Sequence, residues 1–99
     1  MILVKIHQAY RYIVAVCDSD LIDKKFEDGN KQLDLTGNFF KGEEKTEEEV
    51  GEIILDMQLE DATFNIVGKK SCELAKKQGL ISEGGIIHIG GVPIALVLM

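Results

Sequence analysis

The chain has 99 residues, of which 45% are hydrophobic and 28% are charged. This length and composition predict one domain, because a chain of this size can bury a single hydrophobic core. No apolar run reaches the roughly 18 residues that a membrane-spanning helix needs, and the N-terminus lacks the charge order of a secretory signal. We therefore expect a cytoplasmic protein that has no membrane partner.

The net charge of −6 is distributed unevenly along the chain. Residues 1–17 carry +2, residues 18–65 carry −10 and residues 66–99 carry +2. The acidic centre opposes a nucleic-acid backbone, so a contact with RNA would require a local basic patch, and no DNA partner is expected.

The N-terminal third is rich in strand signals. Residues 2–7 and 12–17 are dominated by β-branched and aromatic side chains and predict a hairpin whose second strand is the more buried. Asp18, Ser19 and Asp20 are typical caps and predict a short helical turn after it. A second, more exposed hairpin is expected around Asp28-Gly29-Asn30, where the residues tolerate a tight reversal.

The next segment combines an aromatic loop with a helix. Phe39 and Phe40 lie in a glycine-flanked loop, and since two adjacent aromatic rings cannot easily both be buried, one is expected on a contact surface. Thr46 and Glu49 form a capping-box pattern. Apolar side chains at helical spacing then predict a helix over residues 47–59.

Residues 61–79 support two interpretations. The preferred one is a single helix with Asp61 as N-cap and Gly79 as the C-terminal stop. The alternative is a strand over residues 62–67 followed by a helix that starts near Gly68. Both remain open on the sequence alone.

The C-terminal segment predicts a final hairpin, with residues 86–89 and 92–99 joined by Gly90-Gly91. The unbroken apolar run over residues 94–98 favours a central strand covered on both faces. Together the elements predict an α+β fold with a mainly antiparallel sheet built from hairpins and two helices on one face.

Lysines after a glycine give the first candidate site. If a helix begins at Gly68, its free amides with Lys69 and Lys70 could hold a phosphate or an RNA backbone oxygen. The competing and preferred interpretation is a solvated helix face that also contains Lys76 and Lys77.

The cysteines and histidines do not have the spacing of a metal site. Cys17 and Cys72 are interpreted as small buried hydrophobic residues, although a disulfide between them or a thiol-imidazole pair with His7 or His88 is an alternative. We therefore assign no catalytic residue, no metal ligand and no cofactor.

Two glycines that follow shortly after a histidine form another candidate region. Gly90 and Gly91 allow a close backbone approach to a partner beside His88, although a plain hairpin turn explains them as well. With Asn65, they complete the set of candidate binding residues, which comprises Asn65, Gly68, Lys69, Lys70, His88, Gly90 and Gly91.

Four fragments in the same order resemble a small archaeal family of unknown function, DUF424. They are Ala15-Val16-Cys17-Asp18, the Phe39-Phe40-Lys41-Gly42 loop before Thr46-Glu47-Glu48-Glu49, Asn65-Ile66-Val67-Gly68, and Ile89-Gly90-Gly91-Val92-Pro93. The resemblance implies an archaeal source and points toward translation or RNA processing as the cellular setting.

Three functions are consistent with these observations. The preferred one is a non-catalytic interaction module that contacts a protein or RNA component of the translation machinery. It would do so through the acidic centre or the lysine face. The second is a small ligand-binding protein or enzyme with a site near Asn65, Gly68 and His88, and the third is a self-associating structural protein. The sequence leaves the oligomeric state undetermined.

Overall fold

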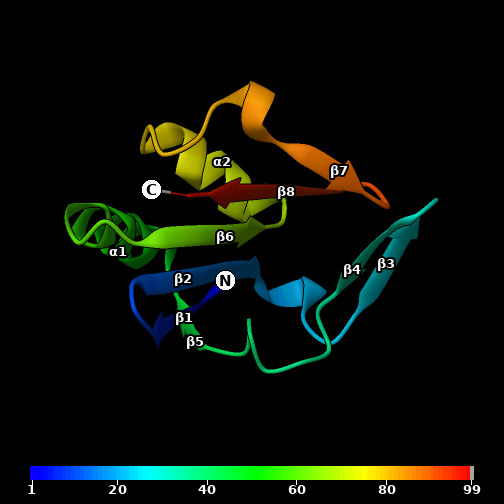
Figure 1. The fold of residues 1–99 in the computed structure, drawn as a ribbon, viewed down its shortest axis with the longest axis horizontal. Helices are drawn as coiled ribbons and strands as arrows, with labels where there is room; N and C mark the ends of the chain where they lie inside the picture. The colour runs from blue at the N-terminus through cyan, green and yellow to red at the C-terminus, as the bar shows by residue number, and fades with distance from the viewer. Residues whose placement is uncertain (99) are drawn as a thin grey trace.

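The computed structural model describes residues 1–98 and shows one large sheet with two helices on one of its faces (Figure 1). The helices are α1 (Glu47–Leu59) and α2 (Lys69–Lys77). Strands β1 (Ile2–Gln8), β2 (Tyr12–Asp18), β5 (Glu43–Lys45), β6 (Thr63–Val67), β7 (Ile87–Ile89) and β8 (Val92–Val97) form the sheet. A separate two-stranded sheet contains β3 (Lys25–Asp28) and β4 (Lys31–Asp34).

The strand order of the large sheet is β5-β1-β2-β6-β8-β7. All neighbours are antiparallel except β2 and β6, which run parallel with Ala15 opposite Asn65. A parallel pair needs a long crossover, and the segment that contains α1 provides it. The predicted α+β fold with a mainly antiparallel sheet and two helices on one face is confirmed.

The main core lies between the sheet and the helices. In Figure 1 the two helices lie behind the sheet, and Val50 and Ile54 of α1 pack with Phe64 and Ile66 of β6 in one buried cluster. The predicted helix over residues 47–59 is confirmed, as is its capping box: the backbone N–H of Glu49 donates to Thr46 Oγ1 at 3.2 Å.

A smaller core covers part of the opposite face. Cys17 and Val67 are buried there beneath Leu35, and Leu33 and Phe40 pack against them. Leu35 comes directly after the β3–β4 hairpin, so that predicted hairpin is confirmed and packs against the sheet. A short 3-10 turn over Ser19–Leu21 links β2 to it, as expected.

The preferred helix over residues 61–79 is wrong, and the strand-then-helix alternative is right. Thr63–Val67 is a strand paired on both sides, and α2 starts at Lys69. Asp61 has a φ of 55°, which is incompatible with the extended backbone of an N-cap. Gly68 has a φ of 110°, so the break between strand and helix occurs at a residue without a Cβ.

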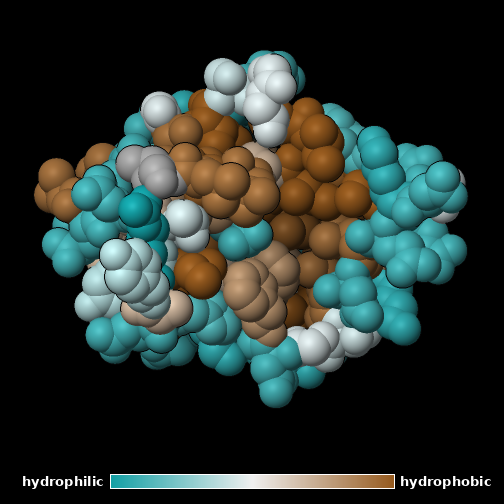
Figure 2. Space-filling view, viewed as in Figure 1, coloured by the Kyte–Doolittle hydropathy of each residue, from teal (hydrophilic) through white to brown (hydrophobic). Residues whose placement is uncertain are grey.

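The last hairpin is confirmed, but the expected burial of its second strand is wrong. β8 lies inside the sheet between β6 and β7, yet the side chain of Leu96 is 57% exposed because no element covers this part of the helix-free face. Figure 2 shows hydrophobic side chains gathered on that face around β7 and β8. Met99, which the prediction included in the strand, lies outside the described residues.

Candidate functional site

The start of α2 is occupied by a carboxylate from the end of β2. Asp18 accepts hydrogen bonds from the backbone N–H of Ser71 at 2.8 Å, from Ser71 Oγ at 2.7 Å and from the backbone N–H of Lys70 at 3.0 Å. Asp18 and Ser71 are both buried. The side chain predicted to cap the turn at residue 19 therefore caps α2 instead, where the helix dipole favours negative charge.

Gly68 makes room for this contact. A Cβ at residue 68 would overlap the carboxylate of Asp18, and the positive φ already favours glycine. The amides that a phosphate would need at Lys70 and Ser71 are thus bound by the chain itself, while the Lys69 and Lys70 side chains are exposed. These contacts give Gly68 a structural role.

The candidate residues lie on two sides of the sheet. His88, Lys69 and Gly91 are brought together, because they line a hollow of about 230 Å³ between α2 and the β7–β8 hairpin. Asn65 faces the opposite side, where it lines a different hollow beside Phe39. A single site built from Asn65, Gly68 and His88 is therefore not formed.

Gly90 belongs to neither hollow. It has a φ of 57°, and a Cβ there would lie 3.2 Å from the Cβ of Phe26 in the β3–β4 hairpin. Gly90 and Gly91 both have a positive φ, as a tight hairpin turn requires. This agrees with the interpretation of the two glycines as turn residues.

The two cysteines are free and buried. Burial raises the pKa of the Cys17 thiol to about 12, with the charges of Asp18 and Asp20 adding to the shift. Burial also raises the pKa of Cys72 to about 11. Because the thiolate is the reactive form, both thiols are poor nucleophiles near neutral pH.

Metal ligation finds no support among residues 1–98, where no group of three or more histidine, cysteine or acidic side chains is placed to hold an ion. His7 instead stacks on Phe39, with ring centroids 4.5 Å apart, and its Nε2 lies 2.9 Å from the Phe39 carbonyl oxygen. In the described part of the chain, no helix is long and apolar enough to cross a membrane.

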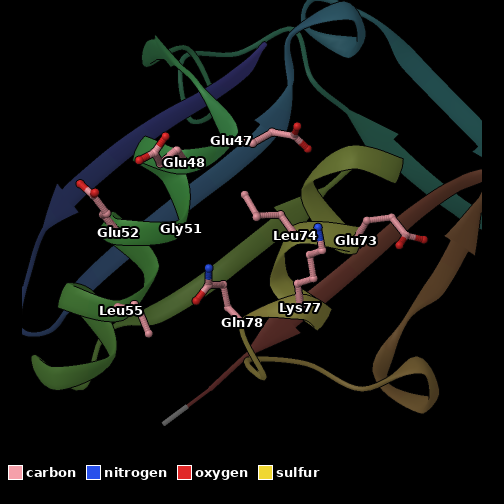
Figure 3. A pocket seen from close by; sticks show the side chains of 9 residues that line it. All are labelled: Glu47, Glu48, Gly51, Glu52, Leu55, Glu73, Leu74, Lys77 and Gln78. Carbon is pink, nitrogen blue, oxygen red and sulfur yellow. The ribbon is translucent and has the colours of Figure 1, made fainter.

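A groove between α1 and α2 combines acidic edges with an apolar floor (Figure 3). Its volume is about 470 Å³. Glu48, Glu52 and Leu55 line it from α1, and Leu74 and Gln78 reach across from α2. Glu47, Gly51, Glu73 and Lys77 complete the lining.

The negative charge of this groove is poorly neutralised. Among the described ion pairs, only one includes a residue that lines the groove. It joins Glu73 to Lys76 at 3.7 Å. Lys76 is also 3.0 Å from Glu83, and the hydrogen bond to Glu83 raises the pKa of Lys76 above its usual value. Four glutamates and a single lysine, Lys77, line the groove and leave an acidic surface next to the 50% exposed Leu55.

The sequence contained a signal for this groove that capping alone does not explain. Glu48, Glu52 and Leu55 recur at helical spacing, so they share a face of α1 that is different from the buried face of Val50 and Ile54. The sequence did not predict that α2 forms the second wall of the groove, because it left the start of this helix uncertain.

The fold and the surfaces define an α+β protein with an acidic groove between its two helices. The chain belongs to the DUF424 family, described as a protein of unknown function, whose model matches residues 7–99. It is also similar to the crystal structure of an uncharacterized conserved protein from Methanopyrus kandleri, with a TM-score of 0.85 and 22% identity. That match covers 99% of this chain and 93% of the other, and shows a shared fold. A search of the curated proteins finds no match.

Proposed function

We propose that this protein is a non-catalytic binding module that holds a basic segment of a protein component of the translation machinery in the groove between α1 and α2. The observation that carries the proposal is the groove itself, which is lined by the acidic residues Glu48 and Glu52 together with the apolar residues Leu55 and Leu74. An amphipathic segment with lysine or arginine on one side and an apolar anchor on the other complements both features.

The charge of the whole chain supports this choice of partner. A net charge of −6 attracts a basic partner at long range and raises the rate of encounter. Proteins that bind RNA phosphates are rich in lysine and arginine, so the translation machinery offers many such segments. The buried thiols and the capped start of α2 favour binding over catalysis.

The groove is tested with a labelled amphipathic peptide rich in lysine and leucine, whose binding is followed by fluorescence anisotropy. Glu48→Lys and Glu52→Lys should each weaken binding about threefold to tenfold, because each converts an attraction into a repulsion. Glu27→Lys is the matched control, since Glu27 is exposed on β3 in the β3–β4 hairpin and outside the groove. Equal losses in all three variants would show that only net charge matters.

The cellular setting is tested separately by sedimentation with purified archaeal ribosomal subunits at low and moderate salt. Co-sedimentation that falls as salt rises, and that Glu52→Lys abolishes, supports a protein contact through the groove. If Lys69→Glu and Lys70→Glu abolish it and Glu52→Lys does not, the partner is RNA at the lysine face. An archaeal source and a cytoplasmic location are part of this proposal.

Self-association is the second candidate function, favoured by the apolar side chains on the helix-free face. Ile87 and Leu96 are both more than half exposed there, and β7 pairs only with the first half of β8. Light scattering across micromolar concentrations decides the point. A dimer mass that Leu96→Lys converts to a monomer mass would support it, and a monomer mass at all concentrations would refute it.

A further inference from the structure

The hollow beside Phe39 lies on the helix-free face, on the other side of the sheet from the acidic groove. Its volume is about 300 Å³, close to the lower limit of ordinary ligand pockets. The segment after β4 forms one wall and β6 forms the other. The lining residues are Asp34, Leu35, Gly37, Phe39, Phe40 and Asn65.

Asn65 provides a polar group that the fold does not use. Its neighbours across the sheet on this face are Ala15 and Leu96, neither of which can form a side-chain hydrogen bond. Within residues 1–98 the side-chain amide of Asn65 makes no hydrogen bond, although the residue is partly buried. An amide in this position has a donor and an acceptor available for a ligand.

Asp34 provides a fixed carboxylate. Its Oδ1 accepts hydrogen bonds from the backbone N–H of Thr36, at 2.9 Å, and from the Thr36 hydroxyl. The hydrogen bond from the Thr36 hydroxyl lowers the pKa of Asp34 the most, and the bond from the Thr36 backbone lowers it further. Lys25 makes a smaller contribution in the same direction. Since Oδ1 is engaged, Oδ2 is the oxygen that remains for a partner.

Phe39 and Phe40 provide an aromatic wall that is held in place. The rings contact each other edge to face with centroids 5.0 Å apart, and one face of Phe39 is covered by His7. Lys5 Nζ donates to the carbonyl oxygen of Asn38 at 2.9 Å and ties the loop to β1. Phe39 is nevertheless 39% exposed, so ring surface remains accessible.

We propose that this hollow binds the guanidinium group of an arginine side chain from a partner protein. A guanidinium is planar and carries only donors, so it can stack on an aromatic ring while it donates to Asp34 and to the amide oxygen of Asn65. A lysine ammonium lacks the planar fork and is held more strongly by water.

A nucleotide is a poorer fit to the same hollow. Two lysines beside the aromatic loop are engaged within the chain, Lys5 with the Asn38 carbonyl and Lys41 with Asp23 at 2.8 Å. Asp34 would repel a phosphate brought close to it. The inference goes beyond the acidic groove, because it uses different residues on the opposite face.

The test is a titration of the isotope-labelled full chain, followed by NMR, with N-acetyl-arginine amide up to tens of millimolar. We expect saturating shifts of the Asn65 side-chain amide and of the Gly37 backbone amide. Asp34→Asn keeps an acceptor for Thr36 but removes the charge, and should weaken binding about tenfold or more. Asn65→Leu should also weaken it, whereas Asp28→Asn at the end of β3 should leave it unchanged.

Three results would overturn the inference. Equal affinity for N-acetyl-lysine amide would show simple charge attraction, and tighter binding of guanosine monophosphate would make the hollow a nucleotide site. No saturable shift at Asn65 or Gly37 would show that the hollow binds no guanidinium. The Glu52→Lys variant should bind N-acetyl-arginine amide normally, which separates this site from the groove between α1 and α2.

Discussion

Replacing Asp18 with alanine should strongly destabilise the fold, because this carboxylate caps α2 from another strand. The change removes hydrogen bonds to the backbone N–H groups of Lys70 and Ser71, and a lost helix cap costs about 1 kcal/mol. It also removes the acceptor of the Ser71 hydroxyl, which lies 2.7 Å from Asp18. Ser71 is fully buried, and a buried hydroxyl left without a partner costs about 1–3 kcal/mol. The two effects together predict a loss of roughly 2–4 kcal/mol.

This loss is large for a chain of this size, since domains are stabilised by about 5–15 kcal/mol in total. Urea unfolding followed by circular dichroism measures it, and the midpoint should fall by about 1–3 M. Asp20→Ala is the matched control, because Asp20 is exposed and two residues away, and should change stability by less than about 0.5 kcal/mol.

A double-mutant cycle identifies the cause. In Asp18→Ala/Ser71→Ala the orphaned hydroxyl is gone, so the double variant should be more stable than the sum of the single losses predicts, by about 1 kcal/mol or more. A loss below about 1 kcal/mol for Asp18→Ala would refute the capping role, and strict additivity in the cycle would refute the contribution of the Ser71 hydroxyl.

The remaining predictions concern the core and the helix starts. Gly68→Ala should destabilise the chain strongly because its Cβ overlaps Asp18, whereas Gly84→Ala, with open space around it, should be close to neutral in urea unfolding. Thr46→Ala should cost about 1 kcal/mol by removing the capping box of α1, which the same unfolding assay measures. Cys17 and Cys72 should resist Ellman's reagent at neutral pH in the folded chain and react only after unfolding. Because the pKa values of both thiols are higher in the folded chain, the thiols of the unfolded chain lose their protons first as pH rises. The free energy of unfolding should therefore be constant below about pH 9 and fall as pH rises toward 11–12, which urea titrations at alkaline pH measure.

Local chemistry was sufficient for the elements that the chain builds from neighbouring residues. The first hairpin, the hairpin around Gly29 and the helix that begins after Thr46 all follow from alternation, turn residues and a capping box within a few positions. The segment at residues 63–67 failed because its apolar residues fit either period. Pairing with β2 and β8 decides for the strand, and neither neighbour is adjacent in sequence.

The candidate sites divide in the same way. One of the two adjacent rings was correctly expected to be exposed: Phe39 is 39% exposed, whereas Phe40 packs against the smaller core. The strand β5 was missed, because three residues rich in charge carry no strand signal and form only against β1. That Asn65 and Asp34 line one hollow could not be predicted, because only the folded chain brings β6 and the segment after β3 together.

The sequence by itself determined the α+β class, the DUF424 resemblance, most of the elements and the acidic character of the centre. Those properties depend on composition and on contacts a few residues apart. Only the tertiary structure decided that Asp18 caps α2 from 52 positions away, that Asn65 and His88 lie on opposite faces, and that α1 and α2 enclose an acidic groove. The reason is physical: strand order and helix placement bring together residues whose separation along the chain carries no periodic signal.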